Sequence, residues 1–424
     1  MSRLFPPVGE GGLTWESKGR RSIEYLTVNG PVQIRRKVYW NRVQGSVTPA
    51  DGWLGMSEGR YSVGVRELCC REAADSDFRT AAEDLACVGQ IRISHETVRR
   101  IVETEGHKAQ GQQKSGALGP DWTAEDCRSG PKEPTCILTG ADGVMVPLVT
   151  EAEKQKRRKK RARRRKGQPK RRAMHKGSDL AYKEFKITAF YDPSKEHQYA
   201  VGLSGPPGKL GELIRRIARQ LHLDEADIKY CVSDGALWIR GLYRIQLPML
   251  DAHILDYYHL RDQVIAAGQA VYGQGTAESL RWRKEICGCL LEEGPEPALA
   301  KIAALHKTLR SAGKRKAKGL VQRRNHKTLR SAGKRKALAS LRQFIATRKE
   351  MLQYPEFRAA GYEIGSGPTE AFCKTLTARL KGQGMRWDKP NAEAIMALAS
   401  MRSSGLWQTY WDTRRKTPAQ PHET

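Results

Sequence analysis

Three carboxylates of this sequence stand in settings that favour a chemical role. Asp142 lies between glycines inside an apolar segment, where an acid is costly to bury unless it is paired or bound to a cation. Asp234 directly follows the apolar segment 230–233, and the carboxyl end of a buried strand is where α/β sheets place ligands. Glu370 follows Ser366, Gly367 and Pro368, a pattern that predicts the first turn of a helix.

Each carboxylate also has an ordinary interpretation: a turn for Asp142, a helix cap for Asp234, and a dipole partner that pairs with Lys374 for Glu370. If the three converge, their oxygens can hold two Mg²⁺ or Mn²⁺ ions. Two such ions about 4 Å apart clamp the attacking and leaving oxygens in phosphodiester displacement. His259, in Asp256-Tyr-Tyr-His259, is then placed to act on the phosphate as a donor or proton carrier.

The elements that must position these side chains read as mixed α/β from Thr135 onward. Strand patterns occur around Asp142, over 185–191 and over 199–203, and an amphipathic helix is expected over 210–221. A buried strand over 230–233 and a further strand within 247–255 complete the set. Three strands, a helix and two more strands is the order of an RNase H-like sheet. Residues 260–350 are helical in pattern and basic.

The N-terminal third has a different organisation. Alternating residues over 28–66 predict a small β-rich module. Residues 78–106 predict two helices, the second capped by Ser94, which suits either a helix-turn-helix DNA reader or an ordinary helical hairpin. The polar, glycine-rich stretch from Gly106 to Gly130 then reads as a linker.

The most unusual feature of the composition is its large positive net charge. Lys plus Arg total 75 against 46 Asp plus Glu, a net charge of +29, which favours a polyanionic partner and above all nucleic acid. The densest run, from Lys154 to Arg172, has little apolar content, is expected to be disordered alone, and is placed to follow DNA phosphates near Asp142. A solvated loop is the alternative. The residues expected to contact DNA are Lys156, Arg157, Arg158, Lys159, Lys160, Arg161, Arg163, Arg164 and Arg165, with Arg99 and Arg100 of the helical hairpin.

Several classes of protein and site are disfavoured. No stretch approaches about 20 consecutive apolar residues, and the first residues lack the apolar region of a secretory signal, so we expect a cytoplasmic protein without a membrane partner. The nine cysteines lack the usual zinc spacing and are expected to be reduced and mostly buried. The segment HKTLRSAGKRKA occurs identically at 306–317 and 326–337, which we interpret as a recent duplication in a tolerant surface helix or loop.

Four stretches resemble bacterial Mutator-like insertion-sequence transposases of the ISKra type, which are DDE transposases. They surround Asp142, Asp234, His259 and the segment from Gly365 to Trp387, with Gly384-Met-Arg-Trp387 among the most specific matches. The likeness covers about residues 30 to 410. Relatives commonly carry a cysteine zinc knuckle near the N-terminus, whereas residues 39–45 contain no cysteine.

The resemblance implies an RNase H-like catalytic core with an all-α insertion, and divalent-metal-dependent cutting and joining of DNA at terminal inverted repeats. It implies Asp142, Asp234 and Glu370 as catalytic metal ligands for two Mg²⁺ (or Mn²⁺) ions, with His259 beside them. The partner is double-stranded DNA of transposon ends and target, bound by a homodimer or higher oligomer. A metal-dependent nuclease without strand transfer, or a non-catalytic DNA-binding derivative, remains the alternative.

The expected organisation follows from these assignments. It comprises a β-rich module over 1–70, a helix-turn-helix-like region over 71–110, a linker over 111–134, the first part of the catalytic core over 135–259, the all-α insertion over 260–355, the final core helix with Glu370 over 356–410, and a tail over 411–424.

Overall fold

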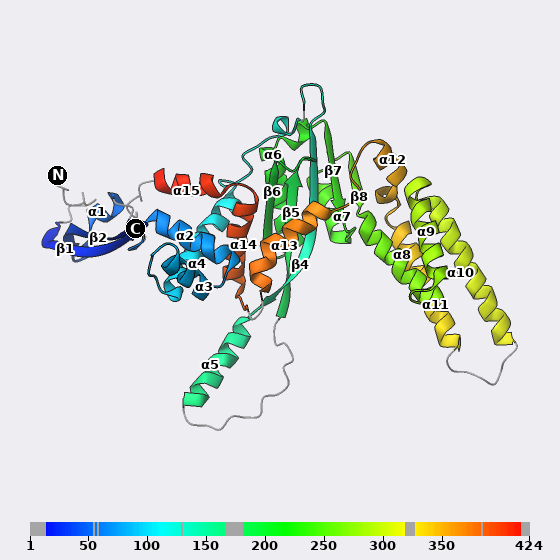
Figure 1. Ribbon diagram of the computed structural model, residues 1–424, viewed down its shortest axis with the longest axis horizontal. Helices are drawn as coiled ribbons and strands as arrows, with labels where there is room; N and C mark the ends of the chain where they lie inside the picture. Colours follow the sequence, from blue (N-terminus) through cyan, green and yellow to red (C-terminus); the bar gives the residue numbers. More distant parts are fainter. Residues whose placement is uncertain are drawn as a thin grey trace.

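Strands and helices alternate in the central part of the chain, and helices dominate the rest (Figure 1). The structure is a computed structural model that describes residues 14–53, 56, 59–128, 130–165, 181–318, 327–382 and 385–416. Two sheets are present in these residues, one of three strands and one of five. The mixed α/β class predicted from the sequence is therefore confirmed.

The three-stranded sheet is N-terminal. Strands β1 (Glu16–Thr27) and β2 (Gly30–Asn41) pair antiparallel around a tight turn, and the short β3 (Gly45–Val47) pairs with the end of β2. The predicted β-rich stretch over 28–66 is correct for β2 and β3 only. Helix α1 (Pro49–Trp53) and the start of α2 (Val63–Asp75) occupy its second half.

Helices α3 (Phe78–Cys87) and α4 (His95–Ser115) form the predicted helical hairpin, and the Ser94 side chain accepts a hydrogen bond from the Thr97 N–H as the N-cap. The linker predicted from Gly106 is wrong in its first part, because α4 continues to Ser115. Gly106 lies inside α4, where a Cβ would come 2.6 Å from the Ala394 carbonyl oxygen. The glycine therefore permits a close helix contact and does not mark a linker.

The ordered chain continues after α4. Leu118 and Trp122 are buried, and a 3₁₀ turn, η1 (Glu125–Cys127), precedes the main sheet. A hydrogen bond from the Ala124 N–H to the Leu221 carbonyl, 2.8 Å, fixes this segment to the region after the first core helix. Most of the expected linker is thus packed against the body of the protein.

The five-stranded sheet has the order β6-β5-β4-β7-β8. Strand β4 is central; it is antiparallel to β5 and parallel to β7, which is in turn parallel to β8, while β6 is antiparallel to β5. The strands are β4 (Cys136–Leu148), β5 (Ala181–Tyr191), β6 (Gln198–Ser204), β7 (Ile228–Ser233) and β8 (Ala252–Leu255). The predicted strands and the helix between the third and fourth are present in that order, with two further helices, α5 (Glu151–Arg165) between β4 and β5 and α7 (Leu237–Gln246) between β7 and β8.

Helices cover both faces of this sheet. Helix α6 (Pro207–Gln220), followed by the 3₁₀ turn η2 (Leu223–Glu225), packs with α7 (Leu237–Gln246), and the α7 residue Tyr243 bonds to Thr139 of β4. On the other face, α13 (Gly367–Lys381) packs on β4, and α14 (Lys389–Ser403) packs on β6 and along α4. Figure 1 shows the sheet between these layers.

The predicted all-α insertion forms the helical arm at one end of the sheet (Figure 1). Its helices are α8 (Tyr257–Tyr272), α9 (Ala277–Glu292), α10 (Pro295–Lys318), α11 (Lys327–Ala346), the 3₁₀ turn η3 (Lys349–Leu352) and α12 (Tyr354–Ala359). The first copy of the repeated segment lies in α10. The described part of the second copy begins α11, and its first residue, His326, lies outside the described residues.

The described part of the basic run is helical. Residues 154–165 belong to helix α5 (Glu151–Arg165), which projects away from the sheet in Figure 1, and 166–172 lie outside the described residues. Lys and Arg have good helix propensity, and Glu153 pairs with Arg157 one turn later. The last described helix is α15 (Trp407–Lys416).

Two expectations about the chain as a whole can be compared with the structure. All nine cysteines are free and seven are buried, as predicted. Among the described residues, none of the helices combines the length and apolar composition needed to cross a membrane.

Candidate active site

Asp142 lies in the middle of the central strand β4, half-buried on the face covered by α13. Two residues earlier on the same face, Gly140 has room for no side chain: a Cβ would lie 2.9 Å from the Val232 carbonyl oxygen and collide with Thr369 of α13. The glycine that interrupts this apolar strand therefore lets the start of α13 approach the sheet beside Asp142.

Asp234 directly follows β7, the strand that pairs in parallel with β4. Every pair in the parallel β4–β7 ladder joins residues 92 positions apart, from Cys136 with Ile228 to Thr139 with Cys231. The same offset separates Asp142 from Asp234. The ladder ends at Thr139 and Cys231, so each acid follows the last pair by three residues.

The backbone after Asp234 turns sharply. The Asp234 carboxylate accepts a hydrogen bond from the Ala236 N–H at 2.8 Å, and Gly235 has a φ of +75°, a conformation that favours glycine. The Arg348 Nε donates to the Gly235 carbonyl at 2.9 Å, so a residue from the end of the helical arm holds this turn.

Glu370 is in the first turn of α13, as predicted. Phe372, Leu376 and Leu380 are buried and fix the orientation of the helix on the sheet, which leaves Glu370 half-exposed with Lys374 one turn along, 3.9 Å away. Ser366 occupies the N-cap position, but its hydroxyl does not cap the helix. It donates instead to Asp256 at 2.6 Å.

His259 joins Glu370 to this network. Its Nδ1 lies 3.8 Å from a Glu370 carboxylate oxygen and 3.5 Å from an Asp256 oxygen. The hydrogen bond to Asp256, together with the charges of Asp256, Asp234 and Glu370, outweighs desolvation and raises the pKa of His259 to about 9. The imidazole is therefore cationic at neutral pH in the metal-free protein.

Asp256 is the residue that fixes His259. It directly follows β8 and caps α8, where its buried carboxylate accepts hydrogen bonds from the His259 N–H at 2.9 Å and from both the N–H and hydroxyl of Ser366. Burial opposes ionisation, but these hydrogen bonds prevail and hold the pKa of Asp256 well below its usual value. One carboxylate therefore connects α8 to the segment that begins α13.

Electrostatics show that the predicted side chains form one group. Burial raises the pKa of Asp142, a hydrogen bond from the Gly143 N–H opposes the shift, and the charge of Asp234 raises the pKa further, while His259 lowers it. The thiol of Cys373 also donates to Asp142. The charges of Asp234 and His259 thus act on Asp142, and His259 also lies beside Glu370; the use of all four as one catalytic site stays a prediction.

The donor set suits a hard cation. Asp256, His259 and Glu370 each offer a ligand atom, and these atoms lie within 4.8 Å of one another. Asp256 uses both oxygens to accept hydrogen bonds from backbone and side-chain groups, and the His259 Nδ1 faces the Asp256 carboxylate, 3.5 Å away. Asp142, Asp234 and Glu370 are half-buried carboxylates, and one oxygen each of Asp142 and Asp234 accepts a backbone hydrogen bond, from Gly143 and Ala236. A carboxylate whose pKa is raised beside another acid gains from a nearby divalent ion, as Asp142 would.

Sequence reasoning missed three contributors. Asp256 was identifiable from its spacing of three residues before His259, typical of a helix cap and the first turn. Arg348 had no such signal, because its partner Gly235 is 113 positions away in the sequence. A glycine within an apolar strand is usually unfavourable for the strand, and only the contact of Gly140 with Thr369 shows why a side chain is excluded there.

The residues predicted to contact DNA are placed unevenly. Lys156, Arg158, Lys159, Lys160 and Arg161 are exposed along α5; the side chains of Arg163, Arg164 and Arg165 lie outside the described residues. The root of α5 is held to the segment before α14 by an ion pair between Lys154 and Asp388, 3.0 Å. In the helical hairpin, Arg99 is paired with Glu96 and Glu103, whereas the nearby Arg100 contacts the Thr97 hydroxyl.

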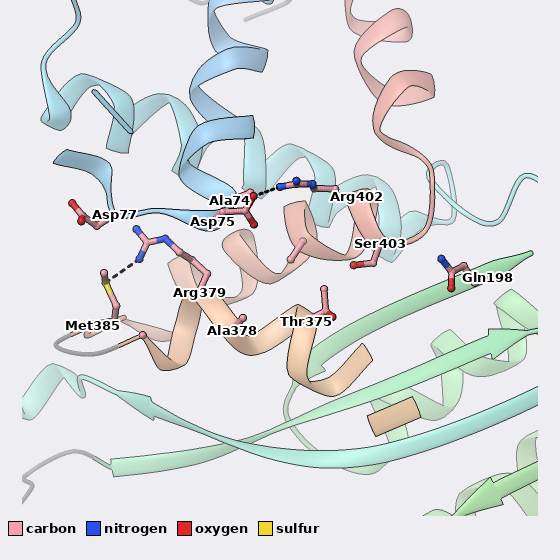
Figure 2. Close-up of a pocket in the computed structure, with 12 residues that line it drawn as sticks. Ala74, Asp75, Asp77, Gln198, Thr375, Ala378, Arg379, Met385, Arg402 and Ser403 are labelled. Carbon is pink, nitrogen blue, oxygen red and sulfur yellow. Dashed lines mark hydrogen bonds and ion pairs between the residues drawn. The ribbon is translucent and has the colours of Figure 1, made fainter. Parts of the chain in front are cut away.

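A cavity of about 660 Å³ lies on a different face of α13 from Glu370 (Figure 2). It is bordered by the turn between α2 and α3, by α13 and by α14. An ion pair between Asp75 and Arg402 crosses its rim, and Arg379 donates to the Met385 sulfur. None of the four candidate site residues lines it.

Comparisons with known proteins give little information about the candidate site. Residues 13–122 match the uncharacterised protein family UPF0236, a region that contains the N-terminal sheet and α1 to α4 but none of the candidate site residues. No curated protein matches the sequence. The chain is similar to a structure described as the Drosophila P element transposase strand transfer complex, with 10% identity, a TM-score of 0.33, and coverage of 82% of this chain and 94% of that one. At those values the similarity supports no argument, so the function must be argued from the site.

Proposed function

We propose that the protein is a DDE transposase with an RNase H-like core, of the Mutator-like insertion-sequence class, that cuts DNA at terminal inverted repeats and joins the ends to a target. The observation that carries the proposal is the packing of α13, the helix that bears Glu370, against β4 beside Asp142, with His259 3.8 Å from Glu370 and the charge of Asp234 acting on Asp142. The strand order β6-β5-β4-β7-β8, with β5 antiparallel to its neighbours, supports the RNase H-like assignment.

In this proposal Asp142, Asp234 and Glu370 hold Mg²⁺ or Mn²⁺, two ions in the complete site. When bound, such ions activate the attacking water or 3′-hydroxyl and stabilise the leaving oxygen. The separate origins of the three ligands, on a strand, a strand end and a helix, give a fixed frame for them.

The other side chains act on the phosphate and on the frame itself. His259 is cationic, so it donates a hydrogen bond or a proton to a phosphate oxygen next to Glu370. Asp256 positions the imidazole through its two hydrogen bonds to residue 259. Arg348 holds the turn that presents Asp234.

The exposed cations of α5 are proposed to follow DNA phosphates on the way to the site, since this helix begins three residues after β4 ends. Arg100 remains a proposed DNA contact, while Arg99 already has two acidic partners. Joining two ends to one target needs more than one active site, so we expect a dimer or larger assembly on DNA.

The test is metal-dependent cutting by the full chain of a duplex that carries the short inverted repeats flanking its gene. Asp142→Asn, Asp234→Asn and Glu370→Gln should each reduce cutting in Mg²⁺ by about 100-fold or more, because each removes charge from the metal site. Asp262→Asn, on the exposed surface of α8, is the matched control and should cut like the parent.

Each outcome has a meaning for the alternatives. Variants that cut as well as the parent would show that the three acids are not the metal ligands. Cutting without joining to a target plasmid would favour a nuclease. Binding without cutting by the parent in either metal would favour a non-catalytic DNA-binding protein.

The alternative ligand set containing Asp256 predicts a different pattern. Asp256→Asn keeps an oxygen that can accept from the backbone, so in our assignment it lowers the pKa of His259 and reduces cutting without abolishing Mn²⁺ binding. Loss of Mn²⁺ binding, measured by calorimetry, in Asp256→Asn but not in Asp142→Asn would instead place the metal at Asp256, His259 and Glu370.

A further inference from the structure

The N-terminal β1–β2 hairpin presents two chemically distinct faces. Paired residues share a face of an antiparallel ladder, and the register pairs Arg20 with Lys37, Ser22 with Arg35 and Glu24 with Gln33. All six of these side chains are exposed. On the opposite face, Ile23, Tyr25, Ile34 and Val38 are partly or fully buried, whereas Arg21 and Val32 are exposed.

The inner face attaches the hairpin to the protein. Arg36, on that face, pairs with Asp51 of α1, and Tyr25 and Val38 are buried. The Leu26 N–H donates to the Arg60 carbonyl at 2.9 Å, and Val28 fills the space that a side chain at Gly64 would need. The outer face is therefore held in a fixed orientation toward solvent.

Like charges stand opposite one another on the outer face. Arg20 and Lys37 are direct cross-strand partners, and Arg35 lies on the same face, two residues or about 6.8 Å along the strand from Lys37. Like charges in directly opposed positions destabilise a β-ladder. In the described part of the chain, no acid lies within ion-pair distance of any of these three cations. The Lys37 ammonium lies 5.1 Å from the centre of the Tyr39 ring, which offsets part of this cost, and an anion that covers the face would relieve the rest.

We propose that the outer face of this hairpin binds the major groove of duplex DNA, with Arg20, Arg35 and Lys37 on the phosphates. A two-stranded ribbon fits the major groove of B-form DNA. Beyond the cations, the face continues with Gln33 and Glu24, whose side chains pair with adenine and cytosine edges respectively. The inference deepens the proposed function, on which it rests for the identity of the partner.

Two other polyanions fit the face less well. An anionic membrane surface favours bulky apolar side chains beside the cations, and the outer face offers Ser22, Glu24 and Gln33 instead. Duplex RNA has a deep and narrow major groove that side chains do not enter. The shape and composition of the face both favour B-form DNA.

The test uses the full chain without divalent ions, so that binding is measured apart from cutting. Arg35→Gln/Lys37→Gln should reduce the slope of log affinity against log salt by about 2 and weaken duplex DNA binding about tenfold at about 0.1 M salt. The same variant should unfold at a nearly equal temperature, because it removes both a like-charge pair and the contact of Lys37 with the Tyr39 ring. A merely structural role of the two residues would lower the unfolding temperature.

The matched control is Arg215→Gln/Arg219→Gln, which removes two exposed cations from α6. It should leave the salt slope unchanged. Equal losses in both double variants would show a general charge effect and overturn the proposal. So would parental DNA binding by the hairpin variant together with lost binding to phosphatidylserine vesicles, which would assign the face to membranes.

The last part of the experiment measures binding to duplex RNA of the same sequence. If RNA binds as tightly as DNA and loses as much in the hairpin variant, major-groove docking is wrong. Gln33→Ala should weaken binding to some DNA sequences more than others at an unchanged salt slope. None of these readouts requires cutting, so a protein that fails the Mg²⁺ assay can still support or refute the hairpin assignment.

Discussion

Single side chains of the candidate site owe their properties to the hydrogen bonds of their neighbours. Asp256 is ionised in a buried position because it accepts three hydrogen bonds. Its negative charge in turn stabilises the protonated form of His259. His259 is cationic next to Glu370 as a result. The spacing of carboxylates and histidine could be predicted from the sequence, but the charge state of His259 could not, since it depends on Ser366, which is 107 positions later.

A histidine outside this group gives the clearest pH dependence. His253 of β8 shares a hydrogen bond of 2.8 Å with Ser233, the residue before Asp234. Burial lowers the pKa of His253 to about 4, and the charge of Arg240 adds to the effect. The unfolded chain takes up this proton near pH 6.5, whereas the folded chain does so only near pH 4. Folding stability therefore falls as the pH drops through that window.

We predict that His253→Gln removes this part of the acid sensitivity. For the parent, the single group should cost about 2 kcal/mol of unfolding free energy between pH 7 and pH 5. Urea unfolding at the two pH values should show a smaller difference in the variant, with His222→Gln, an exposed histidine, as the control. An unchanged difference in His253→Gln would mean that the folded protein binds this proton as readily as the unfolded chain.

At the scale of elements, the site depends on how closely α13 approaches β4. Gly140 provides the space, and Thr369 fills it. The strand, the helix and its buried stripe could all be predicted from apolar spacing, because these are local patterns. The contact could not, since a glycine within a strand pattern indicates either weakness or close approach, and only tertiary packing separates the two.

Gly140→Ala should push α13 away from the sheet. The expected results are a lower unfolding temperature and a loss of metal-dependent cutting of about tenfold or more, because a small displacement of one ligand is costly. Gly241→Ala is the matched control: it lies in α7 with open space around it and should stabilise the protein by about 0.5–1 kcal/mol. Parental cutting by Gly140→Ala would show that α13 tolerates the shift.

For two other elements, local composition did not predict the structure. A dense cationic run was expected to be disordered alone, and in the folded chain its first part is helix α5, stabilised at its start by Glu153 and Asp388. Gly106 was expected to begin a linker, yet it lies within α4 against α14. In both cases the deciding partners are distant in sequence, Asp388 and Ala394, and a local reading has no access to them.

At the scale of the whole molecule, the helical arm is connected to the sheet next to the site. Arg240 of α7 donates to the Thr347 carbonyl and pairs with Glu350, both at 2.8 Å. Arg348 reaches the Gly235 carbonyl, and the Tyr354 hydroxyl donates to the Leu255 carbonyl at 2.9 Å. The helical character of residues 260–350 was predicted from the sequence pattern, but the attachment of the arm to the turn after Asp234 was not.

Removing Arg348 should therefore affect the site more than the fold. A hydrogen bond from a charged group contributes about 1.5–3 kcal/mol, so Arg348→Ala should reduce cutting by roughly 10- to 100-fold. Arg342→Ala, which removes an exposed cation one and a half turns earlier, is the control. Equal activity of Arg348→Ala and the parent would show that the turn after Asp234 keeps its shape without the arm.

The packing of α13 against β4 at Gly140 joins two parts of the chain that the ribosome makes at different times. Between Asp142 and Glu370 lie 228 positions of chain, including the whole helical arm. At about 5–20 residues per second, the ribosome needs on the order of tens of seconds to cover that distance. The basic hairpin and α5 emerge well before the third carboxylate, so under the proposed function a nascent chain can hold DNA before it can cut it.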